Sequence, residues 1–224
     1  MRAKLWSEGI GTFALVFAGT GAIIINDTAG GAVTHVGIAL TFGLVVMALI
    51  YTFGDTSGAH FNPAVTLAFA VDGRFSPRCA LPYIGAQLLG GVAASLLLRA
   101  LFPAHATLGA TAPRGAALQS LLLETILTWF LMLVILRVST GAKEKGITAG
   151  LVVGAVIGLE AMFAGPICGA SMNPARSLAP ALVSGRLGEL WIYIFGPIVG
   201  ALLAVPTLRL VRESEAETAF STSL

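Results

Sequence analysis

Two segments of the chain carry the same polar motif at the start of a short apolar run. Residues 57–68 read SGAHFNPAVTLA and residues 168–179 read CGASMNPARSLA, and seven of the twelve positions are identical. In each copy Asn precedes Pro, a pair suited to a helix start. The Asn side-chain oxygen accepts a backbone N–H, and Pro occupies the first helical position, where its missing N–H costs nothing. The Asn NH₂ group is then free to donate elsewhere.

The two Asn-Pro-Ala motifs, residues 62–64 and 173–175, are called boxes below. Their chemistry depends on where the helices that follow them begin. A helix that starts inside a membrane leaves its first N–H groups without partners, so its end must be buried in protein or line water. Two such ends meeting near the bilayer centre would present two amide donors in a positive field. Neutral hydrogen-bonding solutes could pass, whereas cations and protons would be repelled. We therefore expect a central pore constriction at Asn62, Pro63, Ala64, Asn173, Pro174 and Ala175.

The composition indicates that the chain lies in a membrane. Hydrophobic residues make up 56% and charged residues 11%, with a mean hydropathy of +0.89, whereas a soluble domain carries about 25% charged residues. The net charge of +2 gives no reason to expect nucleic acid as a partner. Cys79 and Cys168 are isolated, so neither a disulfide framework nor a zinc site is predicted. We expect no cofactor, and no set of nucleophile, base and orienting residue suggests an enzyme.

Six apolar segments are long enough to span a bilayer, which requires about 20 residues, so we predict an all-α membrane protein. Two further apolar runs, Val65–Val71 and Ser177–Val183, follow the boxes and are too short to span. They predict two re-entrant half-helices. The six predicted spans are residues 5–26, 34–54, 79–102, 117–139, 147–165 and 189–211.

The order of these segments predicts a duplication. Three spans and a half-helix occur twice, and three is an odd number, so the second copy must enter the membrane from the opposite side. Glu8 and Glu124 stand in the first span of each copy, 54 residues before Asn62 and 49 before Asn173. We expect one transmembrane channel domain over 1–224, built from inverted repeats at about 1–110 and 111–224, with a polar C-terminal tail at 213–224.

The distribution of Lys and Arg predicts the orientation. With the N-terminus inside, nine basic residues face the cytoplasm and three face outward, as the positive-inside rule requires. Both termini are then cytoplasmic in a multi-pass protein of the plasma or inner membrane. The nine are Arg2, Lys4, Arg74, Arg78, Arg137, Lys143, Lys145, Arg209 and Arg212, and the three are Arg99, Arg114 and Arg186.

The six spans, the paired Asn-Pro-Ala boxes and the Arg after the second box resemble the major intrinsic proteins, the aquaporin and aquaglyceroporin channels, over essentially the whole chain. The resemblance implies one pore per protomer and a homotetramer in the lipid bilayer. It also implies an outer selectivity filter from the second and fifth spans and the second loop. By distance to the boxes, the filter positions are Phe42, Ala161, Ala170 and Arg176.

Departures from the family pattern bear on the solute. Strict water channels carry His at the position of Ala161, and typical glycerol facilitators carry Trp at that of Phe42 and Asp at that of Ser177. The chain is most similar to the nodulin-26-like branch. That similarity implies passage of water, glycerol and uncharged metalloid acids such as boric and arsenious acid. Two alanines would leave a wide filter, and a strict water channel remains the alternative.

Other polar residues receive supporting roles. The resemblance implies that Glu8 and Glu124 accept loop N–H groups. His60, two residues before Asn62, is expected to be a hydrogen-bonded residue that shapes its loop beside the pore, with gating by pH as the alternative. Glu160 is expected either as a buried hydrogen-bonded acid facing away from the pore or as a polar group near the outer mouth. His35 and His105 are interpreted as surface residues without partners.

Two other kinds of transporter must be weighed. Inverted repeats with broken helices also build secondary transporters, but coupling ions need acidic or carbonyl sites at the midplane, where the boxes supply amide donors. An ion channel is disfavoured by the paired positive helix ends and by Arg176. A passive channel for neutral solutes is therefore the leading prediction.

Overall fold

The computed structural model describes residues 1–139 and 143–221, and the side chains of 143–147 and 212–221 lie outside the description. Within this part the secondary structure is helical, and no residue lies in a strand. The helices are α1 (Arg2–Thr28), α2 (Thr34–Ser57), α3 (Pro63–Val71), α4 (Pro77–Leu101), α5 (Ala117–Val138), α6 (Lys143–Cys168), α7 (Pro174–Ser184) and α8 (Leu190–Ser221).

The predicted all-α membrane fold is confirmed. Among the described residues six helices are long and apolar enough to cross a membrane, in α1, α2, α4, α5, α6 and α8. Each lies within a few residues of a predicted span. The two short helices, α3 and α7, contain the apolar runs Val65–Val71 and Ser177–Val183 and begin directly after the box asparagines.

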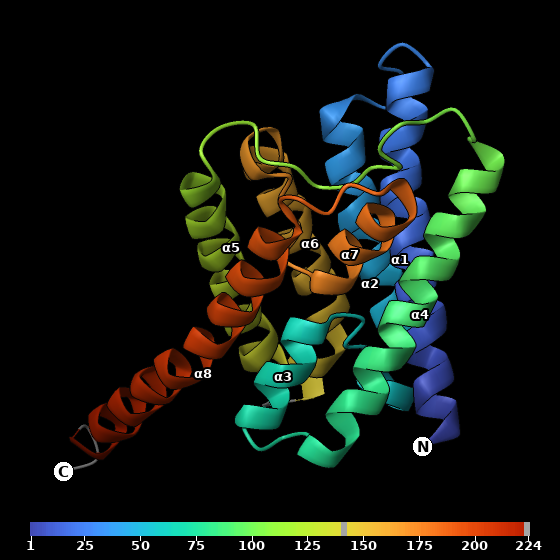
Figure 1. Ribbon diagram of the computed structural model, residues 1–224. Helices are drawn as coiled ribbons and strands as arrows, with labels where there is room; N and C mark the ends of the chain where they lie inside the picture. The colour runs from blue at the N-terminus through green and yellow to red at the C-terminus, as the bar shows by residue number, and fades with distance from the viewer. Residues whose placement is uncertain (140–142, 222–224) are drawn as a thin grey trace.

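The short helices lie in the middle of the bundle and approach each other from opposite ends (Figure 1). Their N-termini are in contact, since α3 and α7 share close residue pairs. Helix α3 packs on α8 and α4, and α7 packs on α4 and α8. The long helices therefore enclose two helix starts that would otherwise face hydrocarbon with unpaired N–H groups.

Contacts between helices recur in matching pairs across the chain. The α1–α4 contact has its counterpart in α5–α8, α1–α2 in α5–α6, and α4–α7 in α8–α3. The α2–α6 and α3–α7 contacts join equivalent helices of the two halves. Exchanging the first four helices with the last four thus leaves the list of contacting helices unchanged.

Small residues bring the halves together along α2 and α6. A Cβ atom added to Gly43 would lie 2.5 Å from the Gly154 carbonyl oxygen, so the backbones touch there. The outward face carries large apolar side chains instead, such as Leu81 at 80% exposure and Leu89 at 74%. That surface suits lipid.

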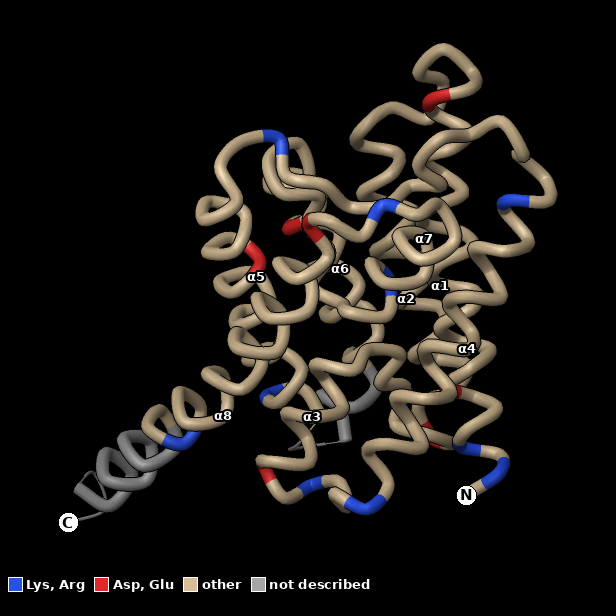
Figure 2. Tube along the Cα trace, viewed as in Figure 1, with Lys and Arg blue, Asp and Glu red and all other residues tan. Residues whose placement is uncertain are grey.

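Basic residues gather at the two ends of the bundle, with more at the end that holds the N-terminus (Figure 2). Three of the nine residues predicted to face the cytoplasm, Lys143, Lys145 and Arg212, have side chains outside the described part. The polar segment 213–224 also falls there. Its backbone continues α8 as far as Ser221.

Candidate functional site

Each box asparagine caps the short helix that follows it. Asn62 has an extended backbone (φ −153°, ψ 121°), and its side-chain oxygen accepts the Ala64 N–H at 2.9 Å. Asn173 is alike (φ −150°, ψ 109°) and accepts the N–H groups of Ala175 at 3.0 Å and Arg176 at 3.3 Å. The Asn-Pro pairs thus form the helix starts that their sequence predicts.

The two asparagines also bond across to each other's loop. Asn62 Nδ2 donates to the Met172 carbonyl at 2.7 Å, and Asn173 Nδ2 donates to the Phe61 carbonyl at 2.9 Å. Each amide NH₂ group thus donates elsewhere, as expected, and its partner is a carbonyl of the opposite loop. An NH₂ group has two donors, so each asparagine keeps a second N–H besides the one that links the loops.

The loops before the asparagines share an unusual backbone. Residues at matching places have positive φ: 51° at Ala59 and 41° at Ala170, then 48° at Phe61 and 54° at Met172. Left-handed conformation costs a non-glycine residue about 1–2 kcal/mol. Both loops therefore need bonds from the surrounding helices to hold this shape.

Glu8 supplies those bonds for the first loop. Its carboxylate accepts the backbone N–H groups of His60 at 3.0 Å and Phe61 at 2.7 Å. It also accepts Ser57 Oγ at 2.7 Å and Gln87 Nε2 at 2.8 Å. Glu8 is 0% exposed. A buried carboxylate with four donors around it is fully satisfied and rigidifies the loop.

Glu124 takes the same place in the second loop. Its two oxygens accept the N–H groups of Ser171 and Met172, each at 2.8 Å. Two tyrosines complete the match: Tyr83 Oη donates to the Ser57 carbonyl at 3.0 Å, and Tyr193 Oη donates to the Cys168 carbonyl at 2.8 Å. Each loop is thus fastened by one glutamate and one tyrosine.

His60 belongs to an aromatic cluster at the first loop. Its ring lies 4.8 Å from that of Phe69, 4.9 Å from that of Phe75 and 5.3 Å from that of Tyr83, centroid to centroid. Its Nδ1 lies 3.1 Å from Thr66 Oγ1. These contacts orient the imidazole and shape the loop.

A cavity of about 100 Å³ begins at the asparagines and extends through the half of the bundle that contains α3. This volume holds several water molecules. The lining is mostly apolar, and its polar side chains are those of His60, Asn62 and Asn173 near the boxes and of Ser139 at the end of α5. Its apolar residues include Val65, Leu131 and Val153.

On the other side of the asparagines, Arg176 and Phe42 are in contact. The guanidinium carbon lies 4.9 Å from the Phe42 ring centroid, a cation–π distance. Arg176 Nη1 donates to the Gly109 carbonyl at 3.0 Å. Ala161 and Ala170 lie in one apolar cluster with Phe42 packed against it. None of the four residues predicted for the filter is among those that line the cavity, and the contact shown among the four is that of Arg176 with Phe42.

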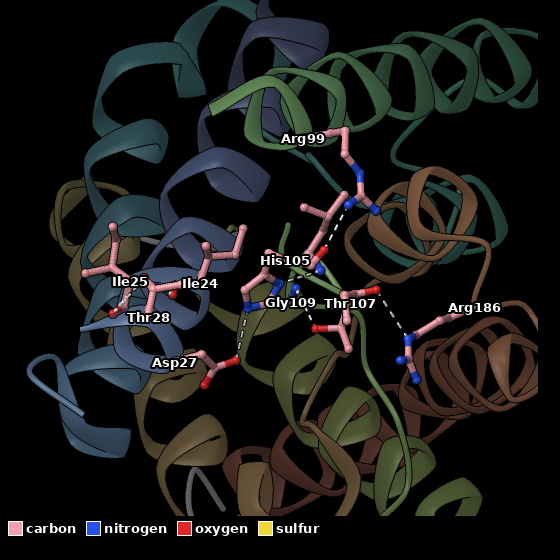
Figure 3. A network of polar contacts seen from close by, with 11 residues as sticks. Ile24, Ile25, Asp27, Thr28, Arg99, His105, Thr107, Gly109 and Arg186 are labelled. Atoms are coloured by element: carbon pink, nitrogen blue, oxygen red, sulfur yellow. Dashed lines mark hydrogen bonds and ion pairs between the residues drawn. The ribbon is translucent and has the colours of Figure 1, made fainter. Parts of the chain in front are cut away.

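Gly109, whose carbonyl accepts the Arg176 hydrogen bond, lies in the loop between α4 and α5. Polar contacts hold the backbone of this loop (Figure 3). Arg99 Nη1 donates to the carbonyls of Pro103 at 3.1 Å and His105 at 2.9 Å. His105 Nε2 lies 3.3 Å from the Asp27 carboxylate, and its Nδ1 accepts the Leu108 N–H at 3.0 Å. His105 was predicted to lack partners; it is instead the centre of this loop.

Two further predictions differ from the structure. His35 is exposed as predicted, but its Nε2 lies 2.7 Å from the Met162 carbonyl, so it has a partner. Glu160 is 1% exposed, and neither carboxyl oxygen has a hydrogen-bond partner among the described residues. One expectation for Glu160 was a buried acid with hydrogen bonds. The burial agrees with it, but no described residue forms those hydrogen bonds.

Sequence reasoning missed three groups that hold the site. Gln87 Nε2 joins Glu8 to Thr66 Oγ1, at 2.8 and 3.0 Å, and Thr111 Oγ1 donates to Ser177 Oγ at 2.8 Å. The third is the Gly109 carbonyl. Gln87 could have been found, since a lone amide in an apolar span predicts a buried partner. A backbone carbonyl and a loop threonine give no such signal.

Comparisons with known proteins agree with this geometry. A family model described as Major intrinsic protein matches residues 1–207. Aquaporin NIP1-1 of Zea mays is 49% identical over 210 residues, covering 93% of this chain and 74% of the relative. Nodulin-26 of Glycine max is 44% identical over 214 residues, covering 95% and 79%. The X-ray structure of the aquaglyceroporin from Plasmodium falciparum superposes with a TM-score of 0.83 at 25% identity, covering 92% and 94%.

Proposed function

We propose that this chain, which belongs to the major intrinsic protein family, conducts water and small uncharged solutes through a pore centred between Asn62 and Asn173. The observation that carries the proposal is the pair of hydrogen bonds that the Asn62 and Asn173 amides donate to each other's loop. They hold two helix starts together beside a cavity of about 100 Å³. The relatives' names, aquaporin and aquaglyceroporin, agree with a multi-pass channel rather than an enzyme.

The boxes select by charge. Each helix N-terminus carries roughly half a positive elementary charge, and the two face each other where α3 meets α7. Each asparagine offers its remaining N–H, which a neutral oxygen can accept. A cation or a hydronium ion gains nothing from such donors and loses its hydration, so it meets a barrier.

The filter selects by size and hydrogen bonding. We assign it to Phe42, Ala161, Ala170 and Arg176, because the guanidinium is held between the Gly109 carbonyl and the Phe42 ring. Fixed in this way, Arg176 presents donors to a solute and repels cations. Two alanine side chains leave room for glycerol and for uncharged metalloid hydroxides, such as boric and arsenious acid, as well as water.

Stopped-flow light scattering of proteoliposomes tests this function. The panel is water, glycerol, urea, boric acid and arsenious acid, each compared with protein-free vesicles. We expect faster volume change with water, glycerol and the two acids. Water alone would identify a strict water channel. Uptake that requires a sodium or proton gradient would identify a secondary transporter, and equal rates in protein-free vesicles would refute a channel altogether.

We also propose that the halves, 1–110 and 111–224, are inverted repeats of one channel domain. The matching helix contacts support it, and so do the matching bonds of Glu8 and Glu124 to their loops. A duplicated loop explains why residues of positive φ recur at equivalent places. Exchanging residues 57–62 with residues 168–173 tests this proposal. If the two segments are equivalent, the exchanged variant should still fold to a helical bundle.

Orientation and assembly are likewise proposals. The excess of Lys and Arg at one end supports cytoplasmic N- and C-termini in a plasma or inner membrane. The family supports a homotetramer, with one pore in each protomer. Cysteine labelling from each side of intact cells tests the first, and cross-linking in membranes tests the second.

A further inference from the structure

A groove separate from the pore runs along the outside of the bundle between α1 and α4. The two helices lie side by side (Figure 1) and are in extensive contact. The groove measures about 690 Å³ and opens outward. Its α1 wall extends from Arg2 through Trp6 to Phe13, and its α4 wall extends from Pro82 to Ala93. The pore cavity shares none of these residues.

Glycines determine the depth of the groove. A Cβ atom on Gly90 would lie 2.0 Å from the Gly9 carbonyl oxygen, so the two backbones touch there and form the floor. A Cβ atom on Gly85 would meet nothing within 4 Å. The groove is therefore open at Gly85, with no neighbouring side chain to fill it.

The length of the groove matches one lipid leaflet. Eleven residue steps separate Arg2 from Phe13 and Pro82 from Ala93, and at 1.5 Å per residue each wall is about 17 Å long. The hydrocarbon core of a bilayer is about 30 Å thick, so one leaflet contributes about 15 Å. An acyl chain in the leaflet nearest the N-terminus of α1 would fill it.

The end of the groove carries an available positive charge. Arg2 is the one charged residue of the lining, and it is exposed. Across residues 1–139 and 148–211, where side chains are described, no carboxylate pairs with it. Trp6, one turn along, is 72% exposed beside it, a position typical of the interface between headgroups and acyl chains.

We propose that this groove binds one phospholipid with an anionic headgroup. Its phosphate lies on the Arg2 guanidinium, and one of its acyl chains lies in the apolar groove between α1 and α4. The apolar walls accept the chain of any phospholipid, and Arg2 makes the site selective for a headgroup of net negative charge. A guanidinium at a membrane surface favours such lipids by about fivefold in binding constant.

Quenching of Trp6 by brominated lipids tests the site. The chain has three tryptophans, so the background Trp129→Phe with Trp191→Phe leaves Trp6 as the one reporter. The protein is reconstituted in phosphatidylcholine containing increasing amounts of dibrominated phosphatidylglycerol or dibrominated phosphatidylcholine. We expect the anionic lipid to quench Trp6 with a binding constant about fivefold higher than that of the zwitterionic lipid.

Three variants decide between explanations, each checked for its fold by circular dichroism. Arg2→Gln should make the two lipids equal, whereas Arg78→Gln, an exposed arginine of α4 outside the groove lining, should leave the preference intact. Gly85→Leu should reduce quenching by both lipids, because it occupies the open groove.

Three results would overturn the proposal. Equal quenching of the unmodified background by both lipids would remove the headgroup selectivity. Equal effects of Arg2→Gln and Arg78→Gln would leave only a general surface charge. Protection of Trp6 from both lipids would mean that a second copy of the chain covers the groove.

Discussion

The two segments that contain the boxes, residues 57–68 and 168–179, share a backbone frame and differ in their side chains. Both have asparagine caps, left-handed residues at equivalent places and a glutamate that accepts loop N–H groups. Where the first loop has His60 and Val65, the second has Ser171 and Arg176. Since the frame is common, we infer that it contributes to charge exclusion in both copies. The differing residues, Arg176 above all, then add a second barrier to cations and decide which neutral solute passes.

The differing residues face different surroundings. His60 is enclosed by aromatic rings beside the apolar cavity. Arg176 is held by the Gly109 carbonyl and lies against the Phe42 ring. The second copy therefore has a fixed, charged donor where the first has the aliphatic side chain of Val65. Selectivity should respond to changes at Arg176 and its neighbours far more than at Val65.

The largest effect is expected at the glutamates. Glu8→Leu removes the acceptor of four donors and Glu124→Leu that of two backbone N–H groups, and each buried donor left unpaired costs about 1–3 kcal/mol. Both variants should lose thermal stability in detergent, Glu8→Leu more. A larger loss in Glu124→Leu would contradict the comparison of the loops.

The second largest effect is expected from Arg176→Val. It gives the second box the residue of the first, so it should admit cations while solute flux persists. The matched control is Arg176→Lys, which keeps a charge but loses the planar fork that reaches the Gly109 carbonyl. Conductance in planar bilayers measures the change. An Arg176→Val channel as silent to ions as the original would show that the boxes alone exclude charge.

A smaller effect is expected from Ala161→His. The imidazole should narrow the filter, lowering glycerol flux by roughly tenfold and water flux by less than about threefold. Ala155→His, on the exposed face of α6, is the control for a histidine in this helix. If Ala161→His lowered both fluxes equally, the filter would have been placed wrongly.

The smallest effect is expected from Glu160→Gln. Because no described residue bonds to its carboxyl oxygens, a neutral amide of the same size loses nothing, and the free energy of unfolding should change by less than about 1 kcal/mol. Glu8→Gln is the contrast, since its NH₂ would face either the Ser57 and His60 donors or the Phe61 and Gln87 donors. Thermal denaturation of both compares them; a large loss in Glu160→Gln would reveal a hidden partner.

Features that depend on neighbouring residues were predictable from the sequence, whereas contacts between residues far apart in the chain were not. Apolar length predicts the helices, and Asn-Pro predicts the caps, because both depend on neighbouring residues. The bond from Asn62 to Met172 joins residues 110 positions apart, so only the packed halves create it. The partners of His105 and the isolation of Glu160 also arise from tertiary packing, which a single sequence does not reveal.

One preparation of proteoliposomes, divided between glycerol efflux and planar-bilayer recording, tests whether neutral solutes pass while ions do not. The crossed asparagines and Arg176 predict efflux well above that of protein-free vesicles, together with no ionic current. Conductance at the same protein density, or efflux equal to that of empty vesicles, would contradict a channel selective for uncharged solutes.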